Sequence, residues 1–236
     1  MITEAIVLAG GLGTRLKEVV PDLPKSLAPI AGRPFMSYLL DYVKKEGIRK
    51  FVFALGYKTE LIEDFVKGYL PKNSYTFSIE TEPLGTGGAV YKACKQITSR
   101  DSIVLNADTF FAVSFSELDR LHEQQNADCT LALKSMTDFN RYGAVSINEK
   151  KEVTGFSEKK HQAKGFINGG VYALNAESFI KRSYPAAFSF EKDYLEKNYQ
   201  KGKILGFISN AYFIDIGIPE DYNKAQLELP ASISHI

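Results

Sequence analysis

The chain has no tryptophan, few cysteines and histidines, and almost no net charge. Its 29 basic and 28 acidic residues leave a formal net charge of +1. A protein that binds nucleic acid or an anionic membrane surface generally shows a marked basic excess or a basic patch, and none is evident here. We therefore expect neither nucleic acid nor a membrane among its partners.

Cys94 and Cys129 are the only cysteines, and neither lies in a CxxC or metal-ligand spacing. We expect both to be buried thiols of a reducing compartment, the alternative being one disulfide. His122, His161 and His235 form no catalytic triad or ligand cluster. We expect structural or surface roles for His122 and His161.

Long hydrophobic runs are also missing. No apolar run approaches the ~18 residues that span a bilayer, and no signal peptide is evident. A cytoplasmic protein is expected. The 236 residues, 44% hydrophobic and 24% charged, have the composition of a globular protein.

Strand and helix patterns alternate through the first half. Apolar runs of β character at 5–8, 51–55, 75–79 and 102–105 are separated by apolar stripes at helical spacing. This order predicts an α/β fold with a doubly wound, mostly parallel sheet and helices on both faces. Short strand candidates after residue 128 predict mixed or antiparallel pairing. We expect one domain over residues 1–229 and a loose tail at 230–236.

The densest motif is Leu8-Ala9-Gly10-Gly11-Leu12-Gly13-Thr14-Arg15-Leu16, followed by Pro24-Lys25. Its glycines let backbone N–H groups approach an anion, and Arg15 and Lys25 add positive charge. The pattern predicts a polyphosphate site directly after the first strand. The alternative is a glycine-rich turn with two solvated cations.

Two common phosphate loops do not fit this motif. A dinucleotide fingerprint, G-x-G-x-x-G, needs a third glycine where Leu16 stands. A Walker-type loop needs glycine immediately before Lys-Ser, and here Pro24 precedes Lys25. The loop instead resembles that of the sugar nucleotidyltransferases, which carry G-x-G-T-R-[LM] and a later P-K element.

The resemblance implies that Arg15 and Lys25 are catalytic and neutralise the triphosphate and the departing pyrophosphate. Ser26 departs from the family, in which many members have a second proline, and this departure should alter loop rigidity only. The nucleotide-binding set implied by the resemblance is Leu8, Ala9, Gly10, Gly11, Gly13, Thr14, Glu80, Gly85, Thr86 and Asn106.

A second motif, Glu80-Thr81-Glu82-Pro83-Leu84-Gly85-Thr86-Gly87-Gly88, matches the loop that holds the base in this family. The alternative is a loop that caps the next helix. A carboxylate can accept from two adjacent donors of guanine, whereas uracil or thymine better suits an amide. We therefore expect guanine, read by Glu80, with Glu82 as the other candidate.

Asp108 and Asp215 each end an apolar strand. Parallel sheets place ligand sites at such ends, and Mg²⁺ takes one or two carboxylates together with substrate phosphates. From spacing alone the two acids are equally well explained as separate caps. The resemblance implies that they bind Mg²⁺, because they stand in matching L-N-x-D and I-D-x-G contexts, with Asp108 also catalytic.

The remaining motifs resemble the family's sugar-phosphate half, expected at residues 126–229, with the nucleotide-binding half at 1–125. Lys159 is implied to be catalytic through the sugar phosphate, although Lys159-Lys160 also reads as a solvated surface pair. The segment Ser189-Phe190-Glu191-Lys192-Asp193 is expected to be structural. The implied sugar-phosphate-binding set is Gly143, Glu158, Lys159, Asn168 and Gly169.

The expected activity is that of an enzyme, a nucleotidyltransferase that joins GTP to a sugar 1-phosphate and releases pyrophosphate, with Mg²⁺ as cofactor. Within the family, the short chain without a C-terminal repeat favours D-glycero-D-manno-heptose 1-phosphate as the sugar. One alternative is a uridylyltransferase acting on an amino-sugar 1-phosphate. Another is a non-catalytic nucleotide-binding regulatory subunit. A homodimer is the expected assembly.

Overall fold

The computed structural model of the chain describes residues 1–11, 16 and 19–233. The elements of its first half are β1 (Glu4–Leu8), η2 (Lys25–Leu27), β2 (Pro29–Ile30), β3 (Arg33–Pro34), α1 (Phe35–Lys45), β4 (Lys50–Leu55), α2 (Thr59–Tyr69), β5 (Tyr75–Ile79), α3 (Gly85–Cys94), β6 (Asp101–Asn106), β7 (Thr109–Phe111) and α4 (Phe115–Gln124). Those of the second half are β8 (Cys129–Phe139), β9 (Ala144–Ile147), β10 (Val153–Ser157), β11 (Gln162–Asn175), α5 (Ala176–Ile180), η3 (Phe190–Leu195), α6 (Glu196–Asn198), β12 (Ile204–Ser209), β13 (Phe213–Asp215) and α7 (Pro219–Ile233).

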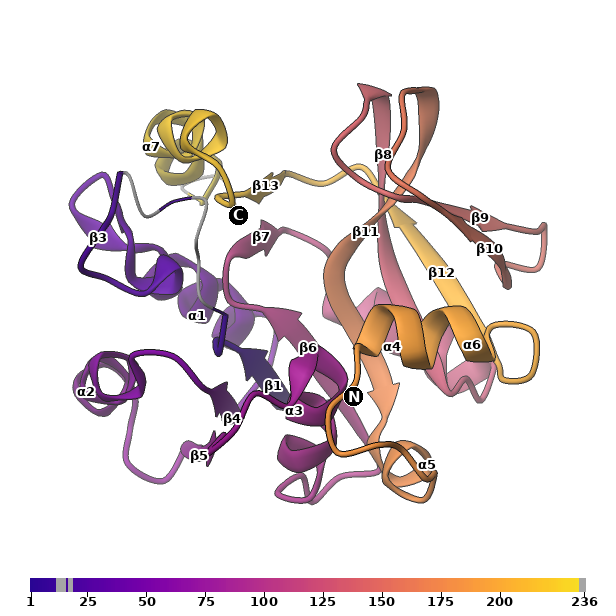
Figure 1. Ribbon diagram of the computed structural model, residues 1–236, viewed down its shortest axis with the longest axis horizontal. Coiled ribbons are helices and arrows are strands. Elements are labelled where there is room, and N and C mark those ends of the chain that lie inside the picture. The colour runs from indigo at the N-terminus through magenta and orange to yellow at the C-terminus, as the bar shows by residue number, and fades with distance from the viewer. Residues whose placement is uncertain (12–15, 17–18, 234–236) are drawn as a thin grey trace.

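In the described part of the chain, nine strands form one sheet (Figure 1). Its first-half strands follow the order β6-β1-β4-β5, all parallel. The chain passes from β1 to β4 and β5 on one side and then returns to place β6 on the other side of β1. The strand order therefore reverses between β1 and β6, which is where open α/β sheets bind ligands.

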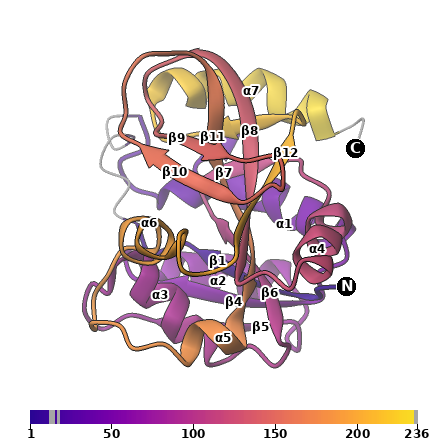
Figure 2. The same cartoon turned by 90° about the vertical axis from the view of Figure 1, so that its right-hand side faces the viewer.

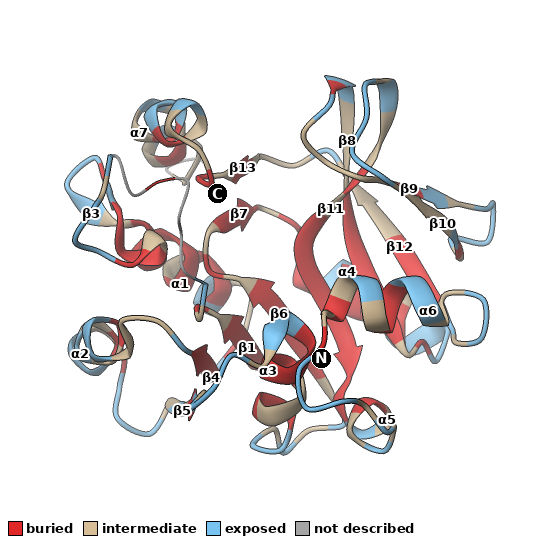
Figure 3. Ribbon diagram, in the orientation of Figure 1, coloured by how far each residue is buried: buried red, intermediate tan, exposed pale blue. Residues whose placement is uncertain are grey.

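Both faces of this sheet are covered, as expected for a doubly wound fold. Side chains alternate along β1, so that Val7 belongs to the cluster packed by α1, α2 and α7, whereas Ile6 belongs to the cluster packed by α3, α5 and η3. Figure 2 shows α1 and α4 on one side of the strands and α3 and α6 on the other. In Figure 3 the strands between these layers are coloured buried.

The second half is antiparallel around one long strand. β11 pairs with β8 along nearly its whole length, with β6 near its C-terminal end and with β9 toward its N-terminal end. The pairing of β8 shifts register between Asn168 and Tyr172, and Gly170 has φ +71° there. The apolar pattern of the sequence indicates a strand only at 170–174. β11 is longer because residues 162–166 are exposed or only partly buried and so do not form an apolar run.

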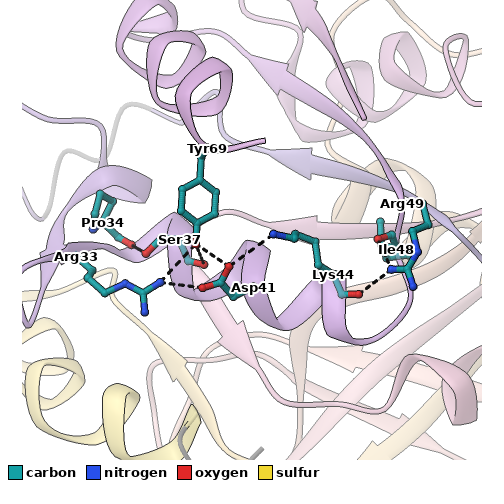
Figure 4. A network of polar contacts seen from close by, with 8 residues as sticks. All are labelled: Arg33, Pro34, Ser37, Asp41, Lys44, Ile48, Arg49 and Tyr69. Atoms are coloured by element: carbon teal, nitrogen blue, oxygen red, sulfur yellow. Dashed lines mark hydrogen bonds and ion pairs between the residues drawn. The ribbon is translucent and has the colours of Figure 1, made fainter. Parts of the chain in front are cut away.

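Polar contacts also tie the first two helices to β3 (Figure 4). The Asp41 carboxylate accepts from Arg33 at 2.8 Å and from the Tyr69 hydroxyl at 2.6 Å. Burial and the bond to Asp41 raise the pKa of Tyr69 to about 12. The hydroxyl is therefore protonated at neutral pH and keeps α2 joined to α1.

Several local expectations can be compared with the structure. Cys94 and Cys129 are buried free thiols, as expected. No helix in the described ranges is long and apolar enough to cross a membrane. The loose tail expected from residue 230 is wrong for residues 230–233, because α7 continues through Pro230 to Ile233. Leu229 is fully buried and anchors that last turn.

One buried carboxylate joins β1 to the turn before β6. Glu4 accepts hydrogen bonds from the backbone N–H and hydroxyl groups of Thr98 and Ser99 at 2.7–2.8 Å. Burial by itself would raise the pKa of Glu4, but these four bonds lower it below its ordinary 4.5. A carboxyl group with a lowered pKa stabilises the fold at pH values above its ordinary pKa, and that contribution is lost as the pH falls through the lowered pKa.

We expect Glu4→Gln to lower the free energy of unfolding by about 1–3 kcal/mol near neutral pH, because the amide cannot accept all four bonds. Urea unfolding at about pH 7 and about pH 4 should show the difference shrinking as Glu4 becomes protonated. The exposed Glu149→Gln is the control and should change neither value. A difference independent of pH would contradict this explanation.

Candidate active site

A cavity of about 460 Å³ opens at the carboxyl ends of β1 and β6, where the strand order reverses. Leu8 and Asn106 end these strands as register partners. The cavity is lined by Leu8, Ala9, Gly10, Gly11, Pro24, Lys25, Ser26, Ala54, Glu80, Pro83, Gly85, Thr86, Ala89, Asn106, Ala107, Asp108, Glu191 and Gly217. The structure thus brings together every described member of the expected nucleotide-binding set. Gly13, Thr14 and Arg15 lie outside the described residues.

Lys25 brings the two expected metal-binding acids together. Its Nζ lies 2.6 Å from Asp108 Oδ2 and 3.8 Å from Asp215 Oδ1. Asp108 is the second residue after β6, and Asp215 ends β13, which pairs antiparallel with β7. The Ile216 N–H donates to the Asp108 carbonyl at 3.1 Å, and the Gly217 N–H donates to Asp215 Oδ1 at 2.8 Å.

The charges of Asp108 and Asp215 favour a bound cation between them. Burial and the nearby charge of Asp108 raise the pKa of Asp215, while Lys25 opposes the rise. No group of three or more metal-ligating side chains occurs within the described ranges. An ion held by Asp108 and Asp215 would therefore need further ligands from a substrate, which suits Mg²⁺ beside phosphates.

Glu80 follows β5 and faces the glycine loop. Its Oε2 accepts from the Leu84 N–H at 3.0 Å, and a Cβ added to Gly10 would lie 3.5 Å from Glu80 Oε1 and 3.2 Å from the Gly56 nitrogen. A Cβ at residue 10 would crowd the Gly56 nitrogen and would be in van der Waals contact with the Glu80 carboxylate. Glu82 is exposed and is not among the residues around the cavity.

The glycines at the start of α3 serve packing. A Cβ on Gly87 would lie 2.3 Å from the Phe188 ring, and one on Gly85 would lie 2.6 Å from the Phe188 carbonyl oxygen. The Gly87 N–H donates to that same oxygen at 2.9 Å. Their lack of side chains allows α3 to approach the segment that leads into η3.

The expected sugar-phosphate residues lie outside the lining of this cavity. Glu158 and Lys159 are exposed and directly follow β10. The Gly143 backbone lies against β10, because a Cβ there would be 2.7 Å from the Ser157 carbonyl oxygen. Asn168 and Gly169 lie in β11, and the Asn168 amide donates to the Tyr172 hydroxyl at 2.8 Å.

Sequence reasoning missed Glu191, which lines the cavity although its segment was expected to be structural. It lies in η3, a single π-helical turn, and its carboxylate accepts from the Thr86 hydroxyl at 2.9 Å. Three charged residues, Glu191, Lys192 and Asp193, stand between the buried Phe190 and Tyr194. No local signal in the sequence distinguishes Glu191 from the other two.

Comparisons with known proteins show the class. The chain matches the family described as nucleotidyl transferase over residues 4–232, and it therefore belongs to that family. The expected resemblance and the α/β fold are confirmed. A 21% identical inositol-1-phosphate CTP transferase of T. maritima has the same fold, with a TM-score of 0.78 over 99% of this chain and 96% of that one.

Two relatives with higher identity carry the same enzyme name, and a solved structure is also similar. The chain is 48% identical over 226 residues to D-glycero-alpha-D-manno-heptose 1-phosphate guanylyltransferase of Aneurinibacillus thermoaerophilus, covering 96% of this chain and 98% of the relative. The enzyme of the same name from Campylobacter jejuni is 44% identical, with coverage of 93% and 96%. The structure of HddC from Yersinia pseudotuberculosis complexed with GMP-PN matches at 39% identity with a TM-score of 0.84, covering 96% and 99% of the chains.

We expect Gly87→Ala to destabilise the protein by about 1–3 kcal/mol, because the added methyl group would overlap the Phe188 ring, which packing holds in position. That ring stacks on Tyr184 with centroids 4.4 Å apart. Urea unfolding of Gly87→Ala, Phe188→Leu and the double variant should show a double loss smaller than the sum of the two single losses.

The matched control is Gly68→Ala in α2, where an added Cβ meets nothing within 4 Å. It should be neutral or stabilising by about 0.5–1 kcal/mol, since alanine is the better helix former. Equal effects of the two glycine substitutions would contradict the packing role of Gly87.

Proposed function

We propose that this protein transfers GMP from GTP to D-glycero-D-manno-heptose 1-phosphate, giving a GDP-activated heptose and pyrophosphate. The observation that carries the proposal is 48% and 44% identity, over nearly the whole of each chain, to enzymes named for that reaction. The cavity supports it, since the described nucleotide-side residues, Lys25 and Asp108 all line one space.

The reaction needs one displacement. An oxygen of the sugar 1-phosphate attacks the α-phosphorus of GTP in line, the new P–O bond forms, and the bond from the α-phosphorus to the bridging oxygen of the leaving pyrophosphate breaks. The nucleophile is already an anion, so neither a general base nor a covalent enzyme intermediate is required. Catalysis then rests on positioning and charge stabilisation.

Among the described residues that line the cavity, Lys25 carries the positive charge. Together with Arg15 it would neutralise the triphosphate and the departing pyrophosphate. The Lys25 ammonium already bonds Asp108, so this residue both anchors the acid and faces the substrate space. Ser26, the departure from the family pattern, is buried next to it. The substitution at residue 26 does not remove the positive charge of Lys25.

Asp108 and Asp215 would hold Mg²⁺, since carboxylate oxygens are its preferred protein ligands and the two acids lie on either side of one ammonium, with Asp215 partly buried. When bound, the ion stabilises charge on the phosphates. Lys159 would bind the sugar phosphate, and Gly143, Glu158, Asn168 and Gly169 would contact the sugar. These residues belong to the proposed sugar-phosphate half, 126–229, beside the nucleotide half, 1–125.

Glu80 is our proposed reader of guanine. Its carboxylate lines the cavity beside Gly10, whereas the exposed Glu82 does not line it. A carboxylate there can accept from both N–H groups on the edge of guanine. We also propose a cytoplasmic homodimer that serves capsule or lipopolysaccharide biosynthesis.

Purified protein with Mg²⁺ should release pyrophosphate from GTP in the presence of the heptose 1-phosphate. The assay crosses five nucleoside triphosphates with a panel of sugar 1-phosphates, including amino sugars. Turnover with UTP and an amino-sugar 1-phosphate would instead favour a uridylyltransferase. No turnover with any pair would favour a nucleotide-binding subunit.

We expect Glu80→Gln to lower kcat/KM for GTP by roughly 10- to 100-fold, as loss of a charged hydrogen bond does. The amide keeps an oxygen to accept from Leu84, so the loop should stay in place. Glu82→Gln is the matched control and should leave the preference for GTP over UTP unchanged. An unchanged preference in Glu80→Gln would refute the role given to Glu80.

A further inference from the structure

We propose that Glu191 binds ring hydroxyls of the sugar 1-phosphate and helps to set which sugar is accepted. This inference rests on the proposed function. Glu191 stands in the cavity wall with the nucleotide-side residues, yet it comes from η3 in the second half of the chain. It is therefore a carboxylate that the sugar-binding half contributes to the cavity.

The turn that carries Glu191 is held at several points. The Ser189 hydroxyl accepts from the Lys192 N–H at 3.1 Å, and Asp193 accepts from the Ser189 N–H at 2.8 Å. Phe190 and Tyr194 are buried on either side of Glu191 in the sequence. Single π-helical turns are frequent at functional sites, and this one leaves only Glu191 of its side chains in the cavity wall.

The carboxylate of Glu191 is oriented by two hydroxyls. Thr86 and Ser189 both donate to Oε2, at 2.9 and 3.2 Å, and the Thr86 hydroxyl accepts from the Phe190 N–H at 2.9 Å. A carboxylate offers about four lone-pair sites, so it keeps capacity to accept from a ligand. These two hydrogen bonds orient the Glu191 carboxylate and leave it able to accept further hydrogen bonds.

Charge selects the kind of ligand. Within the described ranges, no lysine or arginine forms an ion pair with Glu191, and its polar partners above are hydroxyls. A negative side chain without a paired cation repels phosphate and accepts from hydroxyl groups. Glu191 should therefore face the hydroxyl-bearing end of a substrate, with the phosphates nearer Lys25.

The neighbours of Glu191 point to the sugar. Burial and the charge of Glu191 raise the pKa of the Tyr172 hydroxyl, which shows that the two side chains are close. That hydroxyl accepts from the amide of Asn168 at 2.8 Å, and Asn168 is a proposed sugar ligand. Glu191 thus lies at the end of a polar chain that begins on the sugar-binding strand β11.

The test compares wild type, Glu191→Gln and Glu196→Gln. Glu196 is an exposed glutamate in the next turn and serves as the control. Glu191→Gln should raise KM for the sugar 1-phosphate roughly 10- to 100-fold and leave KM for GTP unchanged. With a deoxy-sugar 1-phosphate that lacks the bound hydroxyl, wild type and Glu191→Gln should have the same KM, which a purely structural role would not produce.

An unchanged KM for the sugar 1-phosphate, or a rise confined to GTP, would overturn the inference; the second result would place the contact on the ribose. Calorimetric titration measures the affinity of each variant for each substrate and so tests the same contact without turnover. Thermal unfolding checks that each variant is folded. If wild type fails to turn over, the proposed function fails. If wild type binds the sugar 1-phosphate and Glu191→Gln binds it equally well, only this inference fails.

Discussion

The site depends on one cation between two carboxylates. Lys25 meets Asp108 and Asp215, which come from the first and second halves of the chain and would repel each other without it. The short pairing of β7 with β13 brings the acids together, and η2 inserts the ammonium beside them. Helix η2, the turn after β6 and the end of β13 are thereby joined at one point beside the cavity.

The parallel and antiparallel parts of the sheet contribute different residues around that point. The parallel strands β1 and β6 end at one edge and place the nucleotide-side residues there, because the carboxyl ends of parallel strands lie together. The antiparallel strand β11, which carries Asn168 and Tyr172, pairs with β8 along nearly its whole length and passes from β9 to β6 with its other edge. One strand therefore connects the parallel part of the sheet, beside the cavity, to its antiparallel part.

Most elements and half of the site could be predicted from the sequence. Apolar periodicity indicates α1 and α2. Ser114 followed three residues later by Glu117 is a capping-box pattern at the start of α4, and the Ser114 hydroxyl accepts from the Glu117 N–H at 3.4 Å. Lys25, Asp108 and Asp215 could be proposed because they stand in motifs beside strand ends. Glu191 could not, because its partner Thr86 lies 105 residues away in the chain.

The sequence by itself determined the α/β order, the nucleotidyltransferase motifs and the residue types available for charge, since periodicity, glycine content and charge are local properties. Only the tertiary structure decided which groups meet. It filled the space beside Gly87 with Phe188, placed Glu80 but not Glu82 in the cavity wall, and turned Glu191 into that wall. These outcomes depend on packing between distant segments, and spacing along the chain does not encode the distance between them.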